Sequence, residues 1–506
     1  MTNFWPWPWN RFFSTPPIVI TRVVGIVDTV REAHLVYFGG SGTGKTKHLE
    51  GLLTMDFLRR ALGLCQRGWA CIDVHGDFGN ELIGRLAILC QQFPQMRDQV
   101  VVIDPTIEGW TVGYNPFELR PGEVAERRAR GLADTLITVF KDDPTMVVRM
   151  YRVAYYSFLA LILTRRYLTD MPEFLTNRTF REELVLPLSP HYPDIIRYWT
   201  QELPTDREAI VRVESTANRI GRLVSDPDVA PMFEHSSTLN FRELMDKGAF
   251  VIIRLPKGIL GQDVAYMLAA LLVAEFERAA MSRADIPKED RKPFALVCDE
   301  FVNYLTPSFQ TIVDECRKMR LELIAATQNV ESHLGSDELL ASFLNSVNNI
   351  CAFRLGWKEA DSLVREVFQP ELDQVKESYW QDGRVAGFAI PRERKVWRGL
   401  DEIWEIERRK IMTLKRGELW WREKSNQKTR KIKAFHIHDV SDMPDAHLLP
   451  GARAALLDAV YRRYGSARVR IEPSRVEIIG FLPDKPPPAP PRPANPALPF
   501  GEPIDE

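Results

Sequence analysis

Eight consecutive residues near the N-terminus have the types and spacing of a phosphate-binding loop: Gly39, Gly40, Ser41, Gly42, Thr43, Gly44, Lys45 and Thr46. They fit the pattern G-x-x-x-x-G-K-T, follow an apolar stretch at 34–38 and precede a helical run that begins near residue 47. The glycines let the backbone curl so that N–H groups point at a β-phosphate, and the helix start adds its positive end. We therefore expect Lys45 to reach the β- and γ-phosphates and the Thr46 hydroxyl to hold Mg²⁺.

Two adjacent carboxylates, Asp299 and Glu300, follow the apolar stretch 294–298. Acid pairs at strand ends are common, but one that comes after a phosphate loop and several strands is typical of a nucleotide-hydrolysing site. Asp299 would orient magnesium through water, and Glu300 would polarise the attacking water as general base. The additional glutamate resembles P-loop proteins that couple ATP hydrolysis to motion, so the ligands expected are ATP and Mg²⁺.

Three further residues are candidates for the same reaction. Gln328 ends the next apolar stretch, 322–327, where its side chain could sense the γ-phosphate, because catalytic groups gather at the carboxyl ends of parallel strands. Arg317 and Arg354 are candidates for an arginine that a neighbouring subunit supplies to the transferred phosphoryl group. Judged singly, each arginine is equally well a surface or interface charge.

The stretch 72–77 brings His75 and Asp77 to the end of the second predicted strand, at the edge where a nucleotide binds. Either side chain could assist magnesium or water. Asp77 could instead cap a helix that starts near residue 80. The sequence leaves both interpretations open.

These residues need a sheet to position them. Apolar runs alternate with amphipathic stretches, the pattern of a parallel sheet with crossover helices. The predicted strands are 34–38, 69–74, 99–104, 249–255, 294–298, 322–327 and 350–355. The predicted fold class is α/β.

The strand pattern disappears between residues 117 and 243, where 121–140, 146–167 and 206–224 have helical periodicity. This predicts an all-α insertion that caps one face of the sheet. The predicted domains are an N-terminal arm (1–32), a core in two parts (33–116 and 246–368), the insertion (117–245), a C-terminal extension (369–482) and a proline-rich tail (483–506).

After residue 368 the chain is predicted to be irregular and charged, with a hairpin at 417–437. We expect its turn to contain Lys424, Lys428, Arg430, Lys431 and Lys433. The tryptophan-rich arm would either dock on a partner or fold back onto this chain. The tail is expected to be disordered or polyproline II.

Composition bounds the class of protein. With 506 residues, 45% apolar and 26% charged, the chain is an ordinary globular protein. A net charge of -2 excludes a bulk basic surface, so any contact with DNA must be local. The six cysteines form no C-x-x-C pair and indicate buried thiols in a reducing compartment. No signal peptide or membrane segment is expected, which predicts a cytoplasmic protein.

Five motifs together resemble the type IV secretion coupling proteins and the FtsK/HerA-type translocases, which are hexameric ATPases that pump DNA. The motifs are 39–46, 73–77, 101–105 with 114–116, 240–244, and the block 299–328, and they span most of residues 33–368. The resemblance implies a RecA-like core with the helical insertion of the coupling proteins.

The resemblance also implies roles: Lys45 and Thr46 on nucleotide and magnesium, Glu300 as base, Arg317 as the arginine supplied in trans, and Gln328 as sensor. Two features depart from the family. Coupling proteins usually start with membrane helices, which this sequence lacks, and Val74 stands where the family often has proline. Partners could therefore recruit the chain to the inner face of the membrane.

The leading hypothesis is a hexameric ATPase that binds and translocates DNA in conjugative or secretion-linked transfer, with secretion or relaxosome-type protein partners. The alternative is a secretion-associated ATPase that moves or remodels protein. A small-molecule kinase or signalling GTPase is disfavoured by Glu300 and by the large insertion. An inactive scaffold is disfavoured by the complete catalytic set.

Overall fold

The computed structural model describes residues 31–467 except for 141–143, 204–208, 329–337, 367–374, 386–387, 426–427, 435–436 and 444. The predicted proline-rich tail and all but two residues of the predicted tryptophan-rich arm lie outside the described residues.

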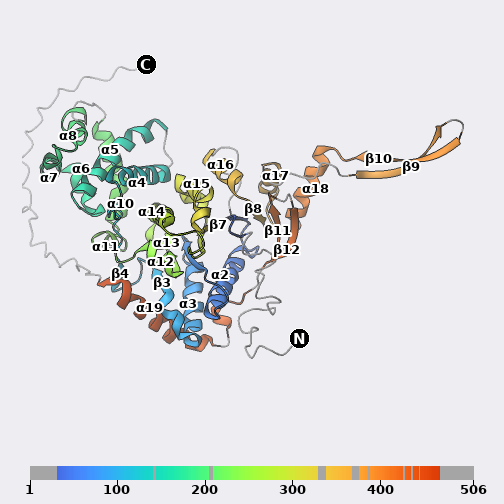
Figure 1. The fold of residues 1–506 in the computed structure, drawn as a ribbon, viewed down its shortest axis with the longest axis horizontal. Helices are drawn as coiled ribbons and strands as arrows, with labels where there is room; N and C mark the ends of the chain where they lie inside the picture. Colours follow the sequence, from blue (N-terminus) through green and yellow to red (C-terminus); the bar gives the residue numbers. More distant parts are fainter. Residues whose placement is uncertain are drawn as a thin grey trace, which may run out of the picture. The chain divides into compact units, whose positions relative to one another are not determined.

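A nine-stranded sheet holds the described chain together, in the order β12-β11-β8-β1-β7-β6-β2-β5-β3 (Figure 1). The strands from β8 to β3 are parallel to their neighbours, and β11 and β12 join antiparallel beside β8. All seven predicted strands are present, with ends that differ by at most three residues, so the α/β prediction is confirmed. The bounds are β1 Leu35–Phe38, β2 Gly68–Asp73, β3 Val100–Ile103, β5 Phe250–Arg254, β6 Phe294–Asp299, β7 Leu321–Thr327, β8 Asn349–Ala352, β11 Glu418–Glu423 and β12 Lys428–Lys433.

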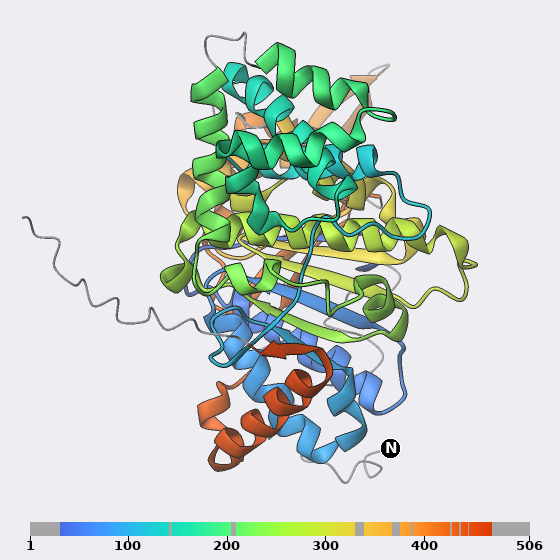
Figure 2. The ribbon, with the colours of Figure 1, turned by 90° about the vertical axis from the view of Figure 1, so that its left-hand side faces the viewer.

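Each face of the sheet has its own apolar core, because alternate strand residues point to opposite faces. In β1, Val36 and Phe38 belong to one core, and Leu35 and Tyr37 to the other. Helix α14 (Gln262–Met281), with α15 (Pro307–Asp314) and α16 (Glu338–Ser346), covers the first face. The second face is covered by α2 (Lys45–Ala61), α3 (Asp77–Gln92) and α19 (Leu449–Tyr464). Figure 2 shows α3 and α19 together, on the other side of the sheet from α14.

The described residues from 113 to 249, here called the helical segment, contain no strand and follow the short strand β4 (Trp110–Val112). Their helices are α4 Ala125–Phe140, α5 Pro144–Leu163, α6 Met171–Thr176, α7 Arg178–Val185, α8 Pro193–Arg197, α10 Ala209–Val224, α11 Ala230–Phe233 and α12 Phe241–Lys247. Helices α4 and α10 contact α14 and share its apolar core. The helical segment therefore packs on the α14 face of the sheet.

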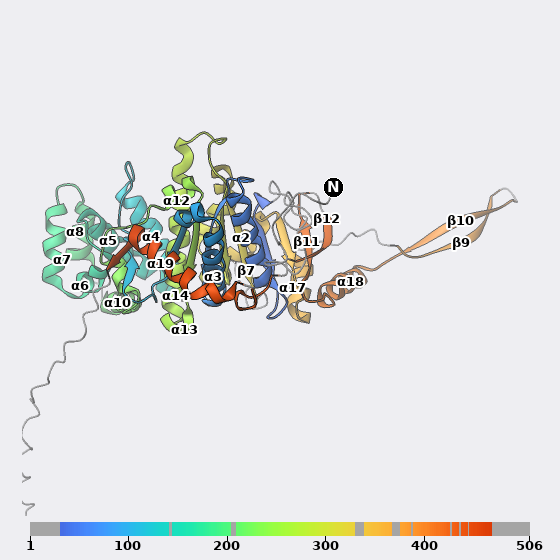
Figure 3. The same ribbon diagram turned by 90° about the horizontal axis from the view of Figure 1, so that it is seen from below.

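The prediction of an irregular chain after residue 368 is wrong. Following α17 (Trp357–Glu366), the chain forms the antiparallel pair β9 (Val375–Val385) and β10 (Phe388–Trp397), then α18 (Leu400–Met412). The hairpin predicted at 417–437 is present as β11 and β12. Helix α19 packs against α3 (Figure 3). A short strand, β13 (Gly465–Ala467), then pairs with β4.

The basic residues of the β11–β12 hairpin are not gathered in its turn. Only Lys424 is in the turn, whereas Lys428, Arg430, Lys431 and Lys433 lie on β12. Strand β12 is at the edge of the sheet, where lysine and arginine prevent pairing with another chain.

The described helices include none with both the length and the apolar character needed to cross a bilayer. All six cysteines are free thiols; five of them are buried, as predicted, whereas Cys65 is half-buried. Burial raises the pKa of the Cys90 thiol to about 12, which keeps it protonated and unreactive.

Two glycine substitutions test the packing with opposite expected signs. A Cβ on Gly68, at the start of β2, would lie 2.4 Å from the carbonyl carbon of Gly248, whereas one on Gly131, inside α4, would meet nothing within 4 Å. Gly68→Ala should lower the free energy of unfolding by roughly 1–3 kcal/mol through overpacking. Gly131→Ala should raise it by about 0.5–1 kcal/mol, the helix preference of alanine. Urea unfolding measures both, and equal effects would contradict the described backbone approach at Gly68.

Candidate nucleotide-hydrolysis site

The loop between β1 and α2 has the backbone of a phosphate cradle. Gly42 and Gly44 have φ values of 72° and 102°, a region that side-chain-bearing residues rarely adopt. Gly44 is the N-cap of α2 and has no side-chain acceptor for the first N–H groups of the helix. Those N–H groups are the ones that hold phosphate at the start of a helix.

Main-chain hydrogen bonds fix this loop to its surroundings. The Gly39 N–H donates to the Thr327 carbonyl at 3.2 Å, and the Gly40 N–H donates to the Arg354 carbonyl at 3.3 Å. Within the loop, the Thr43 hydroxyl donates to the Gly40 carbonyl at 2.7 Å. The cradle is thus anchored to the ends of β7 and β8, the two neighbours of β1.

Lys45 lies between the two predicted acidic residues. Its Nζ is 3.0 Å from Oε1 of Glu300 and 3.5 Å from Oδ1 of Asp299, and the three side chains are 3%, 6% and 5% exposed. The second oxygen of Glu300 accepts hydrogen bonds from the Thr327 hydroxyl and the Gln328 N–H, both at 3.2 Å. The residues expected to bind phosphate and activate water are therefore brought together in one buried cluster.

The backbone at Glu300 is strained. Its φ of 51° lies in the left-handed region, which costs a non-glycine residue on the order of 1–3 kcal/mol. The carbonyl of Asp299 is held by the Tyr304 hydroxyl at 2.7 Å, and the carbonyl of Glu300 by the Asn303 N–H at 3.1 Å. This turn directs the Glu300 carboxylate toward Lys45, and such strain is concentrated at functional sites.

The charges of the cluster fit a divalent cation. Burial raises the pKa of Asp299, the Lys45 ammonium opposes that rise, and the negative charges of Glu300 and Asp73 add to it. Oδ1 of Asp299 is buried and accepts no hydrogen bond from the described residues. Two carboxylates facing one ammonium, with a hydroxyl at Thr46 next along α2, form the oxygen-rich donor set that Mg²⁺ prefers. Bound magnesium would be held by Thr46 and, through water, by Asp299, and would neutralise phosphate charge.

Asp73, which the sequence analysis did not single out, organises the second loop. Its carboxylate accepts the N–H groups of His75 and Gly76 at 2.9 Å each and that of Gly79 at 2.8 Å. The interpretation of Asp77 as the cap of α3 is wrong, because Asp77 is the first residue of the helix and its start is held by Asp73. The side chain of Asp77 is exposed at the same edge of the sheet.

His75 and Gln328 also lie at the carboxyl edge. The His75 side chain is exposed, and the His75 main-chain N–H donates to the Asp73 carboxylate. Gln328 contacts Glu300 through its main-chain N–H. Arg354 follows β8 with an exposed side chain and contacts the loop through its carbonyl. The predicted residues of this edge are therefore neighbours of one site.

Arg317 lies at the opposite edge. It belongs to a short 3₁₀ turn, Cys316–Met319, that precedes β7, and its side chain is exposed. Glu300 follows β6, which runs parallel to β7. Since β7 has 7 residues and a strand rises about 3.3 Å per residue, a strand length of roughly 20 Å separates Arg317 from its own site.

The C-terminal part of the chain supplies contacts that sequence reasoning missed. The Gly417 N–H donates to the Thr43 carbonyl at 3.0 Å, so the start of β11 touches the phosphate cradle. Lys47, which follows Thr46, forms ion pairs with Glu50 at 2.8 Å and with Asp439. The glycine at 417, with a φ of 79°, was the available signal for a turn.

The strand order, the cradle after β1 and the acidic pair after β6 define the fold of the P-loop nucleoside triphosphatases. No protein-family model and no curated protein matches this chain. Among solved structures it is similar to the bacterial conjugative coupling protein TrwB, in the unbound form TrwBΔN70, with a TM-score of 0.58 and 15% identity over 85% of this chain and 92% of that one. TrwB in complex with ADP and Mg²⁺ gives a TM-score of 0.56 and 15% identity, over 84% and 91%. The chain therefore has the coupling-protein fold that the resemblance implied.

Two substitutions separate binding from chemistry at this site. Lys45→Ala should abolish tight binding of Mg·ATP, because Lys45 is the cation of the cradle that would pair with the phosphates. Glu300→Gln should keep binding and lower turnover by roughly 10² to 10⁴, the usual contribution of a positioned base. Titration calorimetry and steady-state hydrolysis measure the two effects. Normal hydrolysis by Glu300→Gln would contradict the assignment of the base.

Proposed function

We propose that this chain is an ATPase that works as a ring and translocates DNA in conjugative or secretion-linked transfer. The observation that carries the ATPase is the buried contact of Lys45 with Asp299 and Glu300 beside an anchored phosphate cradle. Each of the three groups has a separate proposed role: Lys45 begins α2, Asp299 ends β6, and Glu300 lies in the turn after β6 at the same sheet edge.

The chemistry follows from the partners that each group has. The phosphates of ATP compete with the carboxylates for the Lys45 ammonium, which frees Oε1 of Glu300. The other oxygen stays bound to the end of β7, so the freed carboxylate oxygen has a fixed position from which to take a proton from water. Magnesium at the site would neutralise charge on the β- and γ-phosphates.

The position of Arg317 supports a ring. A strand length away from its own acidic pair, it cannot stabilise the phosphoryl group in its own subunit. A second copy that presents its amino edge to this site would bring Arg317 to the phosphate, which is the arrangement of a shared active site. The hexamer and the DNA substrate rest on the likeness to coupling proteins.

The same likeness supports the expected partners: DNA as substrate, and secretion or relaxosome-type proteins that recruit the chain to the inner face of the membrane from the cytoplasm. Movement of protein instead of DNA is the alternative, and stimulation by DNA distinguishes the two.

Hydrolysis assays with single- and double-stranded DNA test this proposal. We expect DNA to stimulate turnover, and Arg317→Ala to lower it by on the order of 10³ or more, the contribution of an arginine finger. Mixing Arg317→Ala with Glu300→Gln should restore activity, because the first variant keeps an intact site and the second supplies the arginine. Lys318→Ala, at the exposed neighbouring position, is the matched control. A rate of hydrolysis that DNA does not change would favour the alternative in which the chain moves protein. Mixtures of the two variants that stay inactive would contradict the shared active site.

A further inference from the structure

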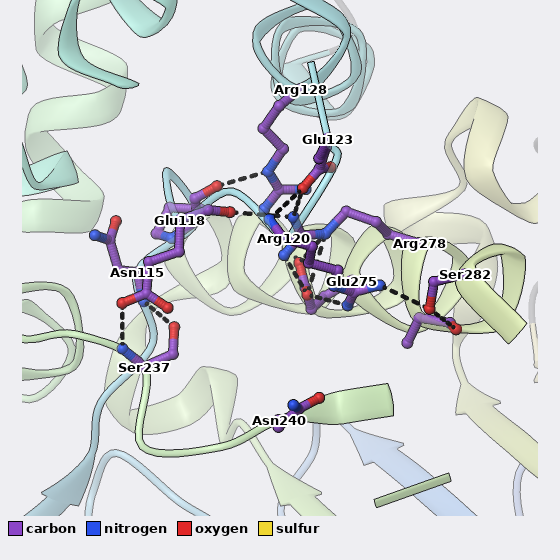
Figure 4. Close-up of polar contacts among 12 residues, drawn as sticks. Asn115, Glu118, Arg120, Glu123, Arg128, Ser237, Asn240, Glu275, Arg278 and Ser282 are labelled. Atoms are coloured by element: carbon purple, nitrogen blue, oxygen red, sulfur yellow. Dashed lines mark hydrogen bonds and ion pairs between the residues drawn. The ribbon is translucent and has the colours of Figure 1, made fainter. Parts of the chain in front are cut away.

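Glu275, in the second half of α14, is the centre of a buried charge cluster beneath the helical segment (Figure 4). Its carboxylate accepts hydrogen bonds from Arg120 at 2.7 Å, Arg128 at 3.1 Å and Arg278 at 2.6 Å, and it is 4% exposed. Burial alone would raise the pKa of Glu275, but the three guanidinium groups lower it to about 2. Glu275 is therefore a carboxylate at any physiological pH, held by three cations.

Both ends of the helical segment meet at this cluster. Near its start, the Asn115 N–H donates to the Ser237 hydroxyl at 3.0 Å, and Glu118 accepts the Ser237 N–H at 2.8 Å. Near its end, Arg242 donates to the carbonyl of Ser282, just after α14. The motifs 114–116 and 240–244, which the nucleotide site does not use, are thus brought together here.

Helix α14 also contacts both ends of the strand that carries the acidic pair. The Phe276 ring lies 5.9 Å from that of Phe294, the first residue of β6. The Tyr266 ring lies 6.3 Å from that of Tyr304, whose hydroxyl holds the Asp299 carbonyl. Helix α14 therefore lies against the first residue of β6 and against the turn that follows β6.

The cluster has room to change its pairing. Arg120, Arg242, Arg278 and Ser282 line a cavity of about 590 Å³, and these arginine side chains are 17–21% exposed. Guanidinium groups on a cavity wall can exchange partners without displacing close-packed apolar side chains, which is not possible inside a dense core.

We infer that the cluster around Glu275 couples the nucleotide cycle at Asp299 and Glu300 to the helical segment. The coupling runs along α14 and reaches both ends of the segment. The inference rests on the proposed function, since it assigns the cluster to the same nucleotide cycle. Glu275 is a positioning residue, because its carboxylate pairs with Arg120, Arg128 and Arg278 and lies outside the cluster of Lys45, Asp299 and Glu300. A purely structural clamp would hold the fold together without transmitting a change from one site to the other.

The test uses Glu275→Gln, which keeps the shape and removes the charge. Hydrogen exchange of the α4 amides (Ala125–Phe140) is measured with and without a non-hydrolysable ATP analogue and magnesium. In the wild type, the analogue should change this exchange. In Glu275→Gln, the affinity for the analogue and the basal rate of hydrolysis should stay within about threefold of the wild-type values. The analogue should no longer change the exchange of the α4 amides. The ratio of DNA-stimulated to basal hydrolysis should fall at least fivefold, the lower end of typical coupling.

Asp56→Asn is the matched control, because Asp56 is also a buried carboxylate, held by Arg31 at 3.0 and 2.8 Å outside the helical segment. Arg120→Gln is the second variant if Glu275→Gln folds poorly. The inference would be overturned if Glu275→Gln or Arg120→Gln kept both the analogue-dependent change in α4 exchange and the wild-type ratio of DNA-stimulated to basal hydrolysis. It would also be overturned if Asp56→Asn lost both to the same extent. A wild type that binds the analogue without any change in α4 overturns the inference alone, whereas a wild type that does not bind the analogue overturns the proposed function.

Discussion

A buried ammonium needs a partner, and in this chain the partner determines how the site is arranged. Lys45 is nearly inaccessible to water, so its charge is stable only beside Asp299 and Glu300. The reverse also holds, since two buried carboxylates repel each other without a cation between them. The loop after β1 and the turn after β6 are therefore held in register by charge, although β7 separates these two strands in the sheet.

The intervening strand β7 explains why Glu300, the proposed general base, has a defined position. Its last residue, Thr327, and the following Gln328 bind one oxygen of Glu300, while Lys45 binds the other. A phosphate that takes Lys45 would release only one of these two attachments. The strained backbone at Glu300 and the bond from Tyr304 to Asp299 keep the turn in place during that exchange.

The sequence predicted the parts of the site that depend on local patterns. The cradle and the acidic pair directly follow apolar strands, so motif and strand order predicted that Lys45, Asp299 and Glu300 share one sheet edge, where the structure brings them together. Asp73 was missed because its role depends on a turn that brings three N–H groups to one carboxylate. Gly417 and Thr43, which are in contact, are 374 residues apart in the chain, and no local sequence pattern predicts such a contact. Arg317 lies on a short 3₁₀ turn where the chain reverses into β7.

Two motifs of the sequence, 114–116 and 240–244, contribute no residue to the nucleotide site, and only the three-dimensional structure shows what they contact. Residues 114–116 and 240–244 are more than a hundred residues apart, yet both contact α14 or the residue after it: the Tyr114 hydroxyl donates to the Leu271 carbonyl, and Arg242 donates to the Ser282 carbonyl. The same helix lies against β6, which ends at Asp299, and against the turn that follows it. One helix thus joins the nucleotide site to the helical segment.

The central claim is that Lys45 exchanges the acidic pair for the phosphates of ATP. An experimental structure of the chain with a non-hydrolysable ATP analogue and magnesium tests it most directly. The account predicts phosphates in the cradle of residues 39–46, Lys45 Nζ on phosphate oxygens and no longer in contact with Glu300, and Oε2 of Glu300 still bound to the end of β7. Phosphates bound elsewhere, or a Lys45 that still bridges Asp299 and Glu300 in the bound state, would contradict it.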